Sequence, residues 1–226
     1  MQPPFSLQQL IQTAVQYNAA ITPLPVLIYI PTLFIFLLLR RSTRQDTSRG
    51  VLLLLAAEWG IVAVLFFMTY VGKLHPVGYF LGGLFLSGGL FYAGAASRAF
   101  PPHFFWTRDL QTWLSLGIAL GGIFGYPLIG WILHRDFPAS ISYGLMPGPV
   151  TMLTLAVLLS ARPAPKLAIM MPAFLWSLTP VLTIWWWGTW EDALLLAAGV
   201  VSLVATLKWR HKLEGAPVKD TLRFDF

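Results

Sequence analysis

Seven apolar segments, separated by short polar loops, constrain this chain more than any other feature of its sequence. A helix needs about 20 residues to cross roughly 30 Å of hydrocarbon, and five of the segments meet or approach that length. Their unbroken apolar runs differ from the alternating pattern of a membrane barrel. The sequence therefore predicts an all-α integral membrane helical bundle over residues 22–209, with seven transmembrane helices: Thr22–Leu39, Gly50–Tyr70, Val77–Ser97, Leu110–Leu133, Val150–Ala161, Leu167–Trp187 and Ala193–Leu207.

Short segments flank the predicted bundle. In residues 1–21, Ser6 is a suitable helix N-cap, and a stripe at helical spacing follows it, opposite a row of glutamines. We expect a short amphipathic helix that lies along the membrane surface. The stripe, apolar except for its last member, consists of Leu7, Leu10, Ile11, Ala14, Val15 and Asn18. Residues 210–226 form a polar tail that is too short to have a core of its own.

Charged residues make up only 11% of the 226 residues, against about 25% in soluble domains. Lys and Arg outnumber Asp and Glu by 15 to 9, but they lie between the apolar segments. We therefore expect the lipid bilayer as the partner, and no nucleic acid. The chain has no cysteine, which excludes disulfides and thiolate chemistry. We expect no cofactor, because the segments lack haem ligands and the chain lacks nucleotide-binding motifs.

The basic residues predict the orientation of the bundle. With seven crossings and the N-terminus outside, thirteen Lys and Arg residues lie on the cytoplasmic side, and only Lys73 and Arg135 lie outside. If the fifth segment did not cross, six would lie inside and nine outside. Positive residues concentrate on the cytoplasmic side of membrane proteins. We therefore expect seven crossings and a cytoplasmic C-terminus.

Glycines are concentrated in the third and fourth segments. Gly82 and Gly83 belong to the third, and the fourth has a four-residue ladder of Gly117, Gly121 and Gly125. Because glycine lets helix backbones approach closely, we expect these two helices to pack against each other. Alternatively, the glycine-rich helices form an interface with a second copy of the chain or with a partner in a membrane complex.

Four stretches together resemble a bacterial multi-pass membrane family catalogued as domain of unknown function 6064. They are the run from Tyr17 to Ile21 with Pro23 behind it, the run His75–Phe80, the stretch from Tyr143 to Leu155, and the run from Pro172 to Leu178. The resemblance covers nearly the whole chain, and its most specific part is the Gly-Leu-Met-Pro-Gly-Pro motif that begins at Gly144. It implies a helical protein of the bacterial inner membrane, and it implies no particular activity.

Glu58 is the only charged residue inside a predicted transmembrane segment. At a rise of 1.5 Å per residue it lies about 12 Å deep. Intramembrane carboxyl groups are costly when ionised, and many of them mark proton or cation routes. Glu58 is therefore either a proton- or cation-binding acid, or a neutral side chain that only hydrogen-bonds to a hydroxyl group. Candidate hydroxyl partners are Ser87, Thr154 and Ser177.

The fifth segment is short and begins directly after Pro147, Gly148 and Pro149. We expect it to start below the outer surface, with free N–H groups that face a polar cavity, as short helices do in some transporters. The alternative is a structural loop that ends early. The candidate substrate- or proton-binding residues in and near this segment, in addition to Glu58, are Tyr143, Met146, Thr151 and Thr154.

No metal site is predicted. His75, His134, Asp136 and Asp192 lie in outer loops and are types that can bind metals, but they lack a recognisable ligand spacing. We interpret them as ordinary exposed loop residues.

Two classes of function remain open. One is a small permease for a proton-coupled solute or a cation, which needs a polar cavity that reaches Glu58. The other is a non-catalytic accessory subunit or assembly factor of a larger membrane complex, which needs a dry interior and a large apolar lateral face. An enzyme is less expected, because the segments offer few polar groups for chemistry.

The charge distribution generates a direct test of topology. A reporter fused after the last residue should be active only as a cytoplasmic reporter, and one fused after Arg135 only as an external reporter, because positive loops stay inside. Alkaline phosphatase, as the external reporter, and a fluorescent protein, as the cytoplasmic reporter, are each fused at both positions to measure their location. An external C-terminus would contradict seven crossings and would indicate that the fifth segment does not cross the membrane.

Overall fold

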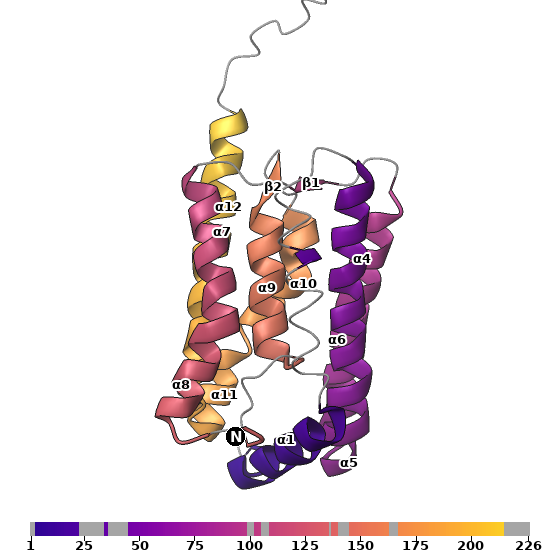
Figure 1. Cartoon of the computed structure of the whole chain (residues 1–226), viewed down its shortest axis with the longest axis vertical. Helices are drawn as coiled ribbons and strands as arrows, with labels where there is room; N and C mark the ends of the chain where they lie inside the picture. Colours follow the sequence, from indigo (N-terminus) through magenta and orange to yellow (C-terminus); the bar gives the residue numbers. More distant parts are fainter. Residues whose placement is uncertain are drawn as a thin grey trace, which may run out of the picture.

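The computed structural model describes residues 3–22, 34–35, 45–98, 102–104, 109–135, 137–139, 145–162 and 167–214. These residues form an all-α bundle, as predicted, with a two-residue antiparallel strand pair at one end (Figure 1). The first predicted segment, Thr22–Leu39, lies almost wholly outside the described residues, as does the tail after Glu214.

The helices run back and forth between two ends of the bundle (Figure 1). We call the end at which the first helix lies the α1 end, and the opposite end the strand end. The elements in chain order are α1 (Leu7–Ile21), α4 (Gln45–Ile61), η1 (Val62–Val71), α5 (Gly72–Leu74), α6 (Val77–Ala96), β1 (His103–Phe104), α7 (Leu110–Leu120), η2 (Gly121–Gly125), α8 (Tyr126–Ile132), α9 (Pro147–Leu159), β2 (Ala161–Arg162), α10 (Leu167–Ser177), α11 (Pro180–Trp187), η3 (Trp190–Asp192) and α12 (Ala193–Glu214).

Five helical stretches are long and apolar enough to cross a membrane. They are Thr47–Leu74, Val77–Ala96, Leu110–Ile132, Leu167–Trp187 and Trp190–Trp209. They correspond to the second, third, fourth, sixth and seventh predicted segments. The fifth corresponds to α9, which has 13 residues and is shorter than a full crossing. A total of seven crossings stays a prediction, since the first segment lies outside the described residues.

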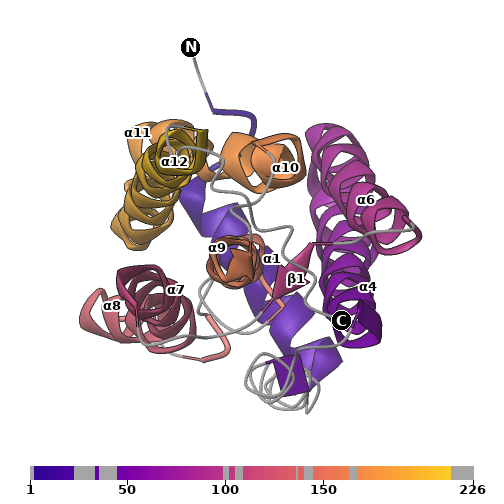
Figure 2. The ribbon, with the colours of Figure 1, turned by 90° about the horizontal axis from the view of Figure 1, so that it is seen from above.

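The short helix α9 occupies the centre of the bundle (Figure 2). It contacts α4, α7, α10 and α12, and every residue from Pro149 to Ala161 is buried. A helix that is apolar on all sides fits such a position. The outer helices differ from it, because each exposes large apolar side chains on one face, for example Leu90 of α6 and Trp113 of α7.

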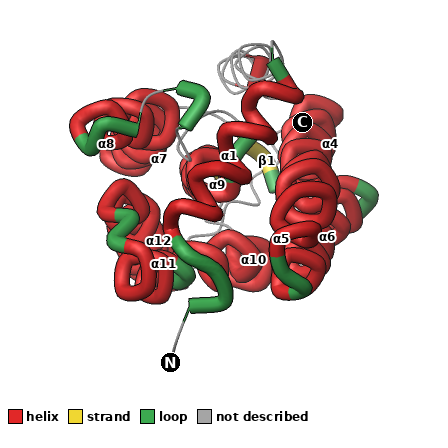
Figure 3. Tube along the Cα trace, turned by 90° about the horizontal axis from the view of Figure 1, so that it is seen from below, coloured by secondary structure: helices red, strands yellow, loops and turns green. Residues whose placement is uncertain are grey.

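The helix α1 lies across the α1 end of the bundle (Figure 3). Ser6 begins it with a capping box: its hydroxyl accepts from the Gln9 N–H, and the Gln9 side chain accepts from the Ser6 N–H. Of the predicted stripe, Ala14 and Asn18 are buried. The buried face also includes Thr13, Tyr17 and Ile21, so it is rotated from the predicted one and carries more polar atoms.

The predicted packing of the third helix against the fourth is wrong. Figure 2 shows α6 and α7 on opposite sides of α9. A Cβ atom at Gly89 of α6 would lie 3.0 Å from the backbone oxygen of Ala56 in α4, so these glycines bring α6 against α4. A Cβ at Gly121 or Gly122 would contact the side chain of Met152 in α9. The glycine faces are real contact faces, but each one meets a different neighbour.

This packing predicts unequal effects of two substitutions on the same helix. Gly89→Leu should lower the free energy of unfolding by about 1–3 kcal/mol, because the facing backbone of α4 cannot move aside. Gly83→Leu should change it by less than about 0.5 kcal/mol, because Gly83 is exposed and has nothing within 4 Å. Thermal unfolding of both variants in detergent measures the difference. Equal effects would contradict the close α4–α6 contact.

Candidate functional site

A cavity of about 330 Å³ lies near the α1 end, between η1, α6, α10, α11 and the start of α9. Aromatic rings form much of its wall: Phe5, Phe66, Phe67, Phe80, Trp176, Trp186 and Trp187. Among the described residues that line it, Asp192 is the only ionisable one, and Thr179 and Thr183 add hydroxyl groups. The sequence predicts a polar cavity at this place; the observed cavity has a mainly apolar wall with one polar corner.

Irregular helix segments shape two sides of the cavity. On one side, η1 is a π-helix of ten residues, and the Thr69 hydroxyl donates to the Val64 oxygen five residues earlier, at 2.8 Å. On the other side, the helix is interrupted between α10 and α11, because Pro180 has no N–H group to continue the backbone hydrogen bonds of α10. The Trp176 oxygen is satisfied there by the hydroxyl of Thr179, at 2.8 Å. Such interruptions of regular helices are frequent at functional sites.

Asp192 forms the centre of a polar cluster beside the cavity. Its Oδ1 accepts from the Tyr126 hydroxyl at 2.9 Å, and its Oδ2 accepts from the hydroxyls of Thr183 at 2.6 Å and Thr189 at 2.8 Å. The donors come from α8, from α11 and from the turn before η3. Three hydroxyl donors stabilise a carboxylate and hold it in one orientation.

A buried ion pair lies next to this cluster. The Arg135 guanidinium pairs with Oε1 of Glu191, which is fully buried. The second oxygen of Glu191 has no hydrogen-bond partner among the described residues. Arg135 can balance only one of the two carboxyl groups, Glu191 and Asp192, so ionisation of both would leave one excess negative charge that a cation could neutralise.

The start of α9 offers little to an anion. Two of its first three residues, Pro147 and Pro149, have no N–H, which leaves few of the free donors that a helix start normally presents. A Cβ at Gly148 would lie 2.6 Å from the Tyr126 hydroxyl, so glycine is needed for the close approach of this ring. Of the first three residues of α9 only Gly148 keeps an N–H, so the start of this helix presents fewer free N–H groups to the cavity than the sequence-based expectation requires.

The cavity ends towards the strand end on stacked aromatic rings. Phe67 and Trp176 of the wall contact Phe85, with ring centroids 5.7 and 4.8 Å apart. Trp59 in turn stacks on Phe85, with ring centroids 4.0 Å apart. The Trp59 indole N–H donates to the Thr154 hydroxyl of α9 at 2.8 Å. We call Trp59, Phe67, Phe85 and Trp176 the aromatic floor.

The predicted acid Glu58 lies apart from the cavity. It is adjacent to Trp59 in α4, is 3% exposed and does not line the cavity. Neither of its carboxyl oxygens has a hydrogen-bond partner in the described part of the chain. Of its predicted hydroxyl partners, Thr154 instead accepts from Trp59 and donates to the Val150 oxygen. Glu58 is therefore a buried acid that the cavity does not reach in this conformation.

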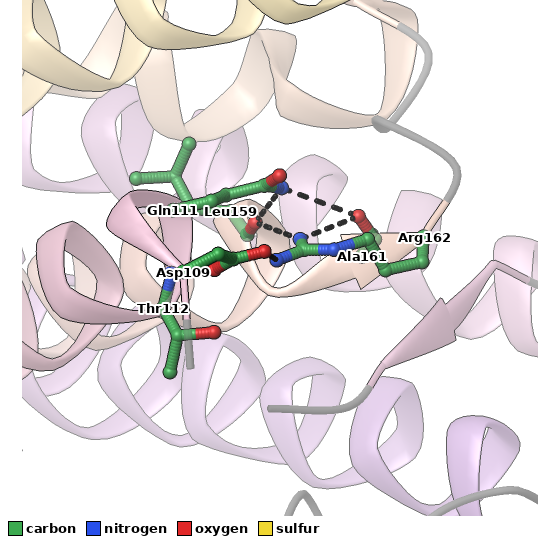
Figure 4. Close-up of polar contacts among 6 residues, drawn as sticks. All are labelled: Asp109, Gln111, Thr112, Leu159, Ala161 and Arg162. Atoms are coloured by element: carbon green, nitrogen blue, oxygen red, sulfur yellow. Dashed lines mark hydrogen bonds and ion pairs between the residues drawn. The ribbon is translucent and has the colours of Figure 1, made fainter. Parts of the chain in front are cut away.

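The strand end closes the other end of α9 with polar side chains (Figure 4). Gln111 donates to the backbone oxygens of Leu159 and Ala161. Arg162 donates to the same oxygens and pairs with Asp109 at 2.7 Å. These contacts satisfy carbonyl groups that the last turn of a buried helix leaves free. The cluster has a structural role, because its N–H groups donate to backbone oxygens at the end of α9 and to Asp109.

The four sequence stretches that carry the resemblance lie at α1, α6, α9 and α10, around the cavity and the central helix. The family of unknown function DUF6064 matches the chain over residues 7–215. The chain belongs to this family. No curated protein and no solved structure matches it. For a DUF6064 protein of unknown activity, the geometry of the site is the main guide to function.

The predicted binding residues are not brought into one site. In this DUF6064 chain, Met146 lines the cavity. Thr151 and Thr154 are buried in α9 and donate to backbone oxygens one turn earlier, at 2.7 and 2.8 Å. Glu58 is buried in α4 and does not line the cavity, and Tyr143 lies outside the described residues.

Sequence reasoning missed the polar corner of the cavity. It treated Asp192 as an exposed loop residue, whereas Asp192 accepts three hydrogen bonds and lines the cavity. The local signal was the spacing of Thr189 and Asp192, which is typical of a capped turn. The contact with Tyr126, 66 residues away, had no local signal. Within the described ranges, no three His, Asp or Glu residues come together as a metal site.

Long-range hydrogen bonds attach the N-terminal segment to the bundle beside the cavity. Tyr17 donates to the Leu145 oxygen at 3.0 Å, and Trp187 donates to the Phe5 oxygen at 2.8 Å while its ring stacks on that of Phe5. Burial, with a smaller contribution from Tyr70, raises the pKa of the Tyr17 phenol, so it stays a donor. The N-terminal segment thus covers the cavity at the α1 end of the bundle.

The Arg135–Glu191 pair predicts a compensated double variant. Arg135→Gln should lower the free energy of unfolding by about 3–5 kcal/mol, because it leaves a buried carboxylate without its cation. Adding Glu191→Gln should recover most of that loss, because position 191 then carries no charge that needs Arg135. Thermal unfolding of the single and double variants checks this. Additive losses would show that the two side chains act independently.

Proposed function

We propose that the protein is a small permease for a cation or a proton-coupled solute, and that it lies in the bacterial inner membrane with its α1 end outside. One observation carries the proposal. A cavity with a single carboxylate, Asp192, ends on the aromatic floor, and a buried acid without a hydrogen-bond partner among the described residues, Glu58, is adjacent in α4 to Trp59 of that floor. The arrangement is that of a site open on one side of a gate.

The aromatic floor has the features of an inner gate. It consists of rings from three separate helical stretches, α4–η1, α6 and α10, which can separate when the helices move. The hydrogen bond from Trp59 to Thr154 attaches it to the central helix. In transporters, helices move around a site near the middle of the membrane, so that access alternates between the two sides. Opening of this floor would connect the cavity with Glu58.

Glu58 has the role of the coupling acid in this proposal. A carboxyl group without a partner in an apolar interior favours its neutral form, and becomes ionised only when a cation or water reaches it. A cation that passes the floor would displace the proton, and the proton would leave with or against the solute. The coupling therefore needs an ionisable side chain at position 58.

An accessory subunit of a membrane complex is the second candidate. It is favoured by the face formed by α7, η2 and α8, where large aromatic side chains are exposed. These are Trp113, Phe124 and Trp131, each about two thirds exposed. Such a face fits either lipid or a partner helix, and it needs no cavity.

Proton coupling is tested with the protein in liposomes that contain a pH-sensitive dye. With an imposed pH gradient, external tetramethylammonium, tetraethylammonium or benzyltrimethylammonium should change the internal pH faster than in protein-free liposomes. Glu58→Gln should abolish this difference, because it keeps the shape but cannot ionise. Glu58→Asp, which keeps the acid, should retain part of the flux.

Two results would contradict the permease. One is the absence of protein-dependent flux for every cation and for the proton alone. The other is an unchanged flux in Glu58→Gln, which would reduce Glu58 to a structural side chain and favour the accessory subunit.

A further inference from the structure

We propose that the cavity binds an amphiphilic organic cation, with an alkylated ammonium group beside Asp192 and an apolar part against the aromatic wall. We further propose that this ligand reaches the cavity sideways from the lipid, between α6 and α11. The inference specifies the substrate class of the permease and so rests on the proposed function, but binding can be measured without transport.

The charge of the polar corner selects a cation. Arg135, which lies beside this corner, is already paired with Glu191. Asp192 has three hydroxyl donors but no ion pair among the described residues. A ligand cation would supply the missing positive charge. With both carboxyl groups ionised, a neutral or anionic ligand would leave one excess negative charge in an apolar region, which is unfavourable.

The wall of the cavity selects an alkylated, weakly hydrated cation over a metal ion. Seven aromatic residues line it, and Trp176, Trp186 and Trp187 are among them. Aromatic faces attract quaternary ammonium groups, and indole is the most favourable ring for this contact. A metal ion needs several oxygen ligands in place of its hydration shell, whereas this wall offers one carboxylate and two threonine hydroxyls. The rest of the wall suits an apolar tail.

Exposed residues mark where the cavity opens. Phe80 of α6 and Leu182 of α11 line it and are 64% and 50% exposed, whereas Phe5 on the side of the N-terminal segment is 8% exposed. Phe80 and Leu182 belong to the stretches Val77–Ala96 and Leu167–Trp187, which are long and apolar enough to span the membrane. Their exposed surfaces therefore face lipid. A ligand that partitions into the outer leaflet meets this opening directly.

Binding is tested with the full chain in nanodiscs and two probes of equal shape. Benzyltrimethylammonium and its neutral carbon isostere, neopentylbenzene, differ only in the charge at one atom. The cation should bind at least about tenfold more tightly than the isostere. Asp192→Asn should remove this preference while the isostere binds as before.

Neighbouring tryptophans provide a matched pair of variants in case Asp192→Asn fails to fold. Trp186→Leu should weaken cation binding, since Trp186 lines the cavity. Trp185→Leu should leave it unchanged, because Trp185 is 82% exposed and does not line the cavity. Equal effects of the two variants would contradict the assigned site.

The sideways route is tested by closing it. The chain has no cysteine, so Phe80→Cys/Leu182→Cys introduces the only two thiols. Bridging them with a bifunctional, thiol-cleavable reagent should block binding of benzyltrimethylammonium, and reduction should restore it. Binding that persists in the bridged protein would place the opening elsewhere.

The binding and flux experiments test the organic-cation site and the permease function separately. Equal affinity for the cation and its isostere would overturn the organic-cation site, even if Glu58-dependent flux of another solute is found. Selective binding without any flux would uphold the site and count against transport.

Discussion

The central helix α9 must have its backbone groups satisfied without water, and the arrangement of the rest of the bundle follows from this need. At its strand end, Gln111 and Arg162 cover the last carbonyl groups. At its α1 end, prolines remove N–H groups that would otherwise need partners. Because the backbone groups at both ends are satisfied or absent, a 13-residue helix can be buried on all sides, and longer helices that face lipid pack around it. The cavity forms where this packing stops, at the proline-rich start of α9.

Much of the fold was predictable because crossing a membrane imposes length and apolarity on each helix separately. The boundaries of α6 and of α10–α11 follow from their apolar runs alone. The partners of each helix were not predictable in the same way. A glycine such as Gly89 indicates that the backbone of another helix approaches it closely. Only the three-dimensional arrangement reveals that this other helix is α4. The same holds for α1, whose buried Tyr17 finds its partner at Leu145.

The candidate site was predicted in part, for a physical reason. Glu58 stands out in the sequence because a charge inside an apolar segment is costly, and its burial is confirmed. Asp192 does not stand out, because a carboxylate in a short loop is ordinary until its donors are known. Its role depends on Tyr126 and Thr183, which belong to other helices. Composition identifies isolated polar groups in an apolar setting, whereas a shared polar corner needs the packing of several helices.

The π-helix η1 sets the rotational phase of everything before it. Each of its turns holds more residues than an α-turn, because its hydrogen bonds skip five residues instead of four. If Val62–Val71 rewound as an ordinary α-helix with the same number of residues, the segment would turn through a larger angle, and the preceding part of α4 would rotate relative to α5. Trp59 would then leave the ring stack, and Glu58 would turn to a different face. The π-helical geometry of η1 is therefore as important to this site as any side chain in it.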